Sequence, residues 1–89
     1  MMCVLLAEDD PIVRRALTRV LGLNRDVEIV GHATDGESAT ALTRELRPDA
    51  LLLNVRLPVH GGIEVTRVLH AEFPALGILA LVVGVRTPS

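Results

Sequence analysis

Four short apolar runs alternate along this chain with segments of helical spacing, and this alternation restricts the possible folds more than any other feature. The apolar runs cover residues 2–7, 27–33, 50–55 and 77–83, and each has the length of a β-strand. Parallel strands need crossover connections, which are usually helices and almost always right-handed. The order βαβαβαβ therefore predicts an α/β domain with a parallel sheet and helices on its faces.

Turn and capping residues bound the three predicted helices. They are Asp10, Pro11 and Gly22 for the first helix, Asp35, Gly36 and Pro48 for the second, and Pro74 after the third. The run at residues 50–55 is apolar on both faces, which is typical of a strand in the middle of a parallel sheet. We therefore expect the third strand to be central.

The composition excludes several classes of protein. With 89 residues, 49% of them hydrophobic, the chain is expected to form one small domain and not a disordered segment. Its nine basic residues, all arginine, form no cluster, so we expect no direct nucleic-acid surface. The single Cys3 allows no internal disulfide, and the opening apolar run is too short for a signal peptide or membrane span. We therefore expect a cytoplasmic protein that does not enter a membrane.

Polar side chains follow two of the predicted strands. Glu8 and Asp9 come directly after the first strand, and Asn54 lies at the end of the third. In sheets of this kind the functional site lies at the carboxyl ends of the strands, which favours a shared pocket. A simpler interpretation also exists, in which the acids form a solvated turn with Asp10 as helix cap and Asn54 only begins a loop.

Three segments of the chain resemble the receiver domain of bacterial response regulators in two-component systems. The segments are VLLAEDDPIVRRAL, VEIVGHATDGESATALTRELRPDALLLNVRLP and GGIEVTRVL. They are most similar to the subfamily that carries a LuxR-type helix-turn-helix output domain. The similarity runs from Val4 to about Val82. It implies a flavodoxin-like (CheY-like) fold, in which an aspartate at the end of the third strand accepts a phosphoryl group from a histidine kinase.

The resemblance assigns a role to several positions of this chain. Glu8, Asp9 and the backbone carbonyl of Arg56 match the ligands of a magnesium ion, a cation that prefers oxygen ligands. Pro58 and Gly62 match the loop that shapes the pocket. His60 lies in the same loop, where a surface histidine with no role in the site is the simpler interpretation.

Three positions depart from the family pattern. Asn54 stands where the family has the phosphoacceptor aspartate, and an amide is not a nucleophile toward phosphorus. Val82 stands where the family has a Ser or Thr hydroxyl, and the chain contains no lysine to match the last conserved group. We therefore expect no phosphorylation, and a magnesium site that is weakened by the loss of one carboxylate.

The resemblance also implies that the domain is incomplete. Receiver domains continue after the fourth strand with a helix, a fifth strand and a last helix, whereas this sequence provides residues 1–83 as an incomplete receiver domain and 84–89 as a short tail. The fourth strand would then be an edge, and one face of the sheet would be partly uncovered. We expect such a domain to dimerise, to swap elements or to be completed by another chain.

Three classes of function stay open at this point. The first is an atypical receiver that acts through contacts with a histidine kinase or another regulator. The second is a truncated remnant that self-associates or sequesters one of these partners. The third is a small phosphate-handling enzyme, which the sequence disfavours because no Gly-rich phosphate loop follows the first strand and no nucleophilic triad falls at strand ends. We therefore expect a protein that is not an enzyme.

Overall fold

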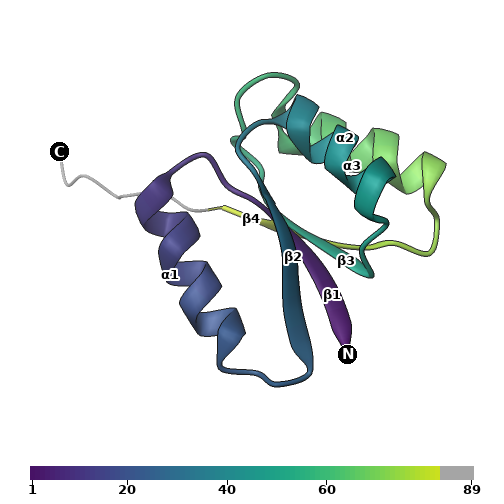
Figure 1. The fold of residues 1–89 in the computed structure, drawn as a ribbon. Coiled ribbons are helices and arrows are strands. Elements are labelled where there is room, and N and C mark those ends of the chain that lie inside the picture. Colours follow the sequence, from purple (N-terminus) through teal and green to yellow (C-terminus); the bar gives the residue numbers. More distant parts are fainter. Residues whose placement is uncertain (83–89) are drawn as a thin grey trace, which may run out of the picture.

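The computed structural model describes residues 1–82, so the predicted domain boundary at residue 83 and the predicted tail 84–89 lie outside the described residues. The elements follow the predicted order: β1 (Met2–Ala7), α1 (Pro11–Gly22), β2 (Val27–Ala33), α2 (Gly36–Leu46), β3 (Ala50–Asn54), α3 (Gly61–Glu72) and β4 (Gly77–Leu81) (Figure 1). None of the helices in this part of the chain is long and apolar enough to cross a membrane.

The four strands form one parallel sheet in the order β2-β1-β3-β4. This confirms the predicted flavodoxin-like fold, and it places β1 and β3 side by side in the middle of the sheet. Ala7 at the end of β1 is in register with Leu53, one residue before the end of β3. The segments that follow these two strands therefore leave the sheet at neighbouring points.

Helices cover both faces of the sheet, with α1 on one side and α2 and α3 together on the other (Figure 1). Successive residues of a strand point to opposite faces, so β3 contributes to two separate cores. Leu51 and Leu53 belong to the core beneath α2 and α3, whereas Leu52 packs with residues of α1. A strand that is apolar on both faces is buried on both faces, as its sequence predicts.

The predicted caps begin the first two helices. The Asp10 carboxylate accepts a hydrogen bond from the Ile12 backbone N–H at 2.8 Å, which satisfies one of the free donors of the first turn. Asp35 and Ser38 form a capping box, in which the Asp35 carboxylate accepts from the Ser38 N–H at 2.6 Å. The hydrogen bonds from Ser38 hold the pKa of the Asp35 carboxyl below its ordinary value.

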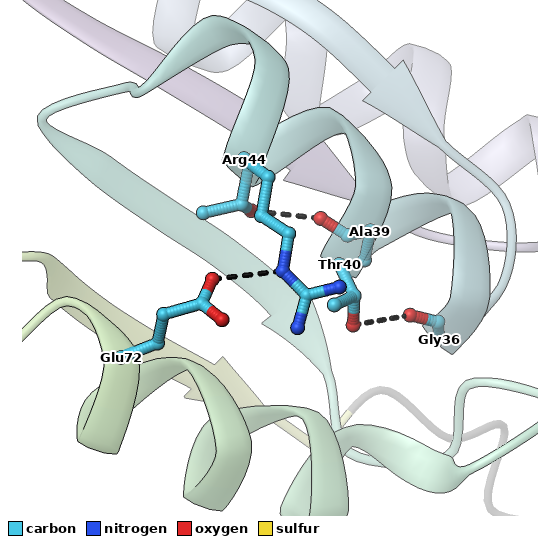
Figure 2. A network of polar contacts seen from close by, with 6 residues as sticks. Gly36, Ala39, Thr40, Arg44 and Glu72 are labelled. Atoms are coloured by element: carbon cyan, nitrogen blue, oxygen red, sulfur yellow. Dashed lines mark hydrogen bonds and ion pairs between the residues drawn. The ribbon is translucent and has the colours of Figure 1, made fainter.

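An ion pair joins α2 to α3 on the outer surface. The Arg44 Nε of α2 donates to the carboxylate of Glu72 on α3 at 2.8 Å (Figure 2). One helical turn before Arg44, the Thr40 hydroxyl donates to the Gly36 carbonyl. Both ends of the ion pair are exposed, so it contributes little to stability. It bridges the two helices on their outer surface.

Candidate functional site

Glu8 and Asn54 meet at the carboxyl edge of the sheet. Glu8 directly follows β1 and its side chain is buried, with a residue exposure of 1%, while Asn54 ends β3 with an exposure of 7%. The Asn54 Nδ2 donates to both oxygens of the Glu8 carboxylate, at 3.0 Å and 3.2 Å. The structure thus brings together two of the predicted site residues through a direct side-chain contact.

The other end of the Asn54 amide holds the loop that follows β3. Its Oδ1 accepts a hydrogen bond from the backbone N–H of Arg56 at 2.9 Å. The Asn54 backbone carbonyl accepts from the N–H of Leu57 at 3.2 Å. Asn54 therefore fixes the first turn of the β3–α3 loop, defined here as residues 55–60, in addition to binding Glu8.

The acidic turn after β1 is tied to α1. The Glu8 Oε2 accepts from the backbone N–H of Asp10 at 3.3 Å, and the Glu8 backbone carbonyl accepts from the guanidinium of Arg14 at 2.9 Å. Asp9, the other predicted magnesium ligand, is exposed. The contact of Arg14 with the Glu8 carbonyl is not evident from the sequence, because the helical pattern places Arg14 on a solvated face of the helix.

Pro58 lies in the β3–α3 loop and Gly62 is the second residue of α3. Each of these two predicted pocket residues makes a backbone contact that holds the loop in place. The Pro58 carbonyl accepts from the Gly36 N–H at 2.9 Å, and this joins the loop to the start of α2. The Gly62 N–H donates to the Val55 carbonyl at 3.0 Å. A β-carbon on Gly62 would lie 2.5 Å from the Val55 Cα, so this close approach requires glycine.

Val82, the last predicted pocket residue, directly follows β4 and is exposed. The preceding residue, Leu81, is in register with Asn54, and its carbonyl accepts from the Val55 N–H at 2.9 Å. Val82 therefore lies at the same edge of the sheet as Asn54. Its side chain offers no hydrogen-bonding group to that edge.

Three successive residues of the chain have left-handed backbone conformations where the loop enters α3. The φ angles are 54° for Val59, 69° for His60 and 58° for Gly61. Gly61 adopts this conformation at no steric cost, but a β-branched residue such as Val59 does not. The strain at Val59 and His60 has no signal in the sequence, because only Gly61 is a residue type that favours this conformation.

Replacing Val59 with glycine is expected to stabilise the domain by about 1 kcal/mol, because it removes the left-handed strain of a β-branched residue. Val59 is exposed, so few contacts are lost. The free energy of unfolding from urea titration measures the effect, with Val59→Ala as a control that keeps the β-carbon. A Val59→Gly variant less stable than the parent would contradict the strain.

Comparison with known proteins gives this strand edge its context. Residues 4–87 match the family described as the response regulator receiver domain. The chain belongs to this family. Glu8 and Asn54 both lie within the matched range.

The similar proteins include transcriptional regulators. The chain is 37% identical over 83 residues to the response regulator GacA of Pseudomonas viridiflava, with 93% of this chain and 39% of GacA covered. A LuxR-family two-component response regulator from Aurantimonas has a similar structure, with a TM-score of 0.88, 32% identity, and coverage of 96% of this chain and 61% of that one. The signal receiver domain of the response regulator NarL from Mycobacterium tuberculosis aligns with a TM-score of 0.87 and 28% identity, covering 96% and 68% of the two chains. This chain therefore spans well under half the length of the curated regulator.

Receiver domains typically bind Mg²⁺ at the phosphorylation site. Within residues 1–82 of this chain, no group of three His, Cys, Asp or Glu residues is placed to hold a metal ion. Both oxygens of the Glu8 carboxylate are already hydrogen-bonded to Asn54. The side chains present here therefore do not fit the magnesium site that is typical of receiver domains.

Proposed function

We propose that this chain is a receiver domain that signals through protein contacts and without phosphorylation of its own. The observation that carries this proposal is the amide of Asn54, which is buried at the end of β3 and hydrogen-bonded at both ends. A carboxylate can attack phosphorus to form an acyl phosphate, whereas a carboxamide cannot. The absence of a hydroxyl on the Val82 side chain supports the same proposal.

Incubation of the purified chain with acetyl phosphate and Mg²⁺ is expected to add no phosphoryl group, as measured by intact mass spectrometry. A receiver domain with an aspartate at the acceptor position, treated in parallel, shows that the donor is active. Asn54→Asp is expected to accept phosphate only poorly, because Val82 still offers no hydroxyl to the phosphoryl oxygens. A stoichiometric adduct on any residue of the unmodified chain would contradict the proposal.

Receiver domains interact with kinases and with other proteins. For this chain we propose a histidine kinase or another response regulator as the partner, and the cytoplasm as the compartment. A net charge of −2 with no basic cluster does not favour direct contact with nucleic acid by this segment. Phosphate release from generic phosphoesters tests the alternative of a small phosphate-handling enzyme, and we expect none.

A second copy of the chain is a further candidate partner, and the edge strand β4 favours it. Residues 73–82 contain no charged side chain, whereas β2, the opposite edge of the sheet, carries Glu28. Charged residues normally protect an edge strand against pairing with another chain. Leu79 is 61% exposed, although Leu52 beside it on β3 is only 7% exposed.

An edge whose only polar groups are backbone N–H and C=O is complementary to itself in an antiparallel arrangement. We therefore propose that two copies pair through β4. Light scattering across a range of concentrations, with circular dichroism of the same peak, is expected to show a folded dimer. A folded monomer at every concentration would contradict the self-association.

A further inference from the structure

Only one orientation of the Asn54 amide satisfies both of its partners. Its Nδ2 faces the Glu8 carboxylate at 3.0 Å and 3.2 Å, and its Oδ1 faces the N–H of Arg56 at 2.9 Å. The reverse orientation would place an oxygen against a carboxylate and an NH₂ group against another donor. The two partners therefore fix which end of the amide points into the acidic turn.

An aspartate at position 54 would have the same shape but the opposite contact. One of its oxygens would still accept from Arg56, and the other would occupy the place of Nδ2, 3.0 Å from a buried oxygen of Glu8. Two carboxylates at this distance repel each other unless a cation or a proton lies between them. The N–H of the amide removes this requirement, because it bonds to the carboxylate directly.

Binding of a cation would disrupt this arrangement. A divalent cation prefers oxygen ligands, so Asn54 would have to turn its Oδ1 toward the ion. That rotation breaks the hydrogen bond to Arg56 and both contacts to Glu8. Within residues 1–82, no buried side-chain nitrogen or oxygen lacks a hydrogen-bond partner, so no buried side-chain acceptor of this part of the chain is left for a cation to satisfy.

We propose that the Asn54 amide is a built-in replacement for the divalent cation, so that the β1 turn and the β3–α3 loop are held together in the same way with and without Mg²⁺. This inference rests on the proposed function and adds to it that the site is independent of the metal as well as of phosphate. Arg14 strengthens the arrangement, because its guanidinium binds the Glu8 carbonyl and ties α1 to the same turn.

Thermal unfolding of the full chain tests this inference with Mg²⁺ as the probe. The midpoint is measured from zero to millimolar MgCl₂, with NaCl of equal ionic strength as the reference. The parent chain is expected to show no Mg²⁺-specific shift. Asn54→Asp is expected to unfold about 5 °C or more below the parent without Mg²⁺, and to recover part of this loss when Mg²⁺ is added.

A double variant that exchanges the two groups is the matched control. Glu8→Gln combined with Asn54→Asp restores one amide and one carboxylate at the same contact with the same total charge as the parent. We expect its midpoint to lie above that of Asn54→Asp and to be insensitive to Mg²⁺. Folding of Asn54→Asp only when Mg²⁺ is present would support the inference in the same way.

Two results would overturn the inference. The first is a Mg²⁺-specific rise in the midpoint of the parent chain equal to that of Asn54→Asp. The second is an Asn54→Asp variant that matches the parent without Mg²⁺ and does not respond to it. Either result would leave the proposed function intact if the chain still accepts no phosphoryl group, so failure of the inference and failure of the proposed function can be told apart.

Discussion

Replacing Gly62 with alanine is expected to destabilise the domain by about 3 kcal/mol, because the new β-carbon has no space. It would lie 2.5 Å from the Val55 Cα, 2.6 Å from the Asn54 carbonyl oxygen and 2.6 Å from a methyl group of Leu53. Two of these three atoms belong to the backbone, so a change of rotamer cannot relieve the clash. The start of α3 must move away from the end of β3, and the loop between them must move with it.

Gly22→Ala is the matched control, because no atom lies within 4 Å of a β-carbon built at that position. Gly22 is the last residue of α1, where alanine is a better helix former than glycine. Its free energy of unfolding is therefore expected to equal or exceed that of the parent. Urea titration of both variants measures the difference, and equal stability of Gly62→Ala and Gly22→Ala would contradict the close packing at Gly62.

Local patterns predict most of the fold of residues 1–82, because each element carries its own signal. The apolar runs predict β1 to β3 almost to the residue, and Asp10 and Asp35 mark the starts of the first two helices. The third helix begins at Gly61. His60, the residue before this helix, has a left-handed backbone, and its side chain makes no capping hydrogen bond. The sequence signal for the start of this helix is therefore weak.

The site was predictable as a set of residues but not as a set of contacts. The positions of Glu8 and Asn54 follow from the rule that parallel strands place their carboxyl ends at one edge. The direction of the Asn54 amide depends on Glu8, which is 46 residues away in the sequence. The contact of Arg14 with the Glu8 carbonyl depends on how α1 is placed against the turn that precedes it. The close approach of the strained Val59 to Gly36 likewise joins two distant segments, and no local pattern records it.

Changing Leu79 to glutamate is expected to weaken the self-association proposed for β4. Leu79 is the central residue of β4 (Gly77–Leu81), so a symmetric antiparallel pair centred on this strand places the two copies of Leu79 opposite each other. Two glutamates at this point would repel, and each would also be taken out of water without a partner. We expect the dissociation constant of the dimer to rise at least about tenfold, which corresponds to about 1.4 kcal/mol.

Ile12→Glu is the matched control for this prediction, because it introduces the same charge in place of a hydrophobic residue that is 79% exposed. Ile12 lies in the first turn of α1, where an acidic side chain is favourable, and α1 takes no part in the proposed pairing. Sedimentation velocity at several concentrations measures both variants, with circular dichroism to verify that each is folded. Loss of the dimer in Leu79→Glu alone would assign the interface to β4, whereas equal loss in both variants would show that net charge, and not the strand edge, controls association.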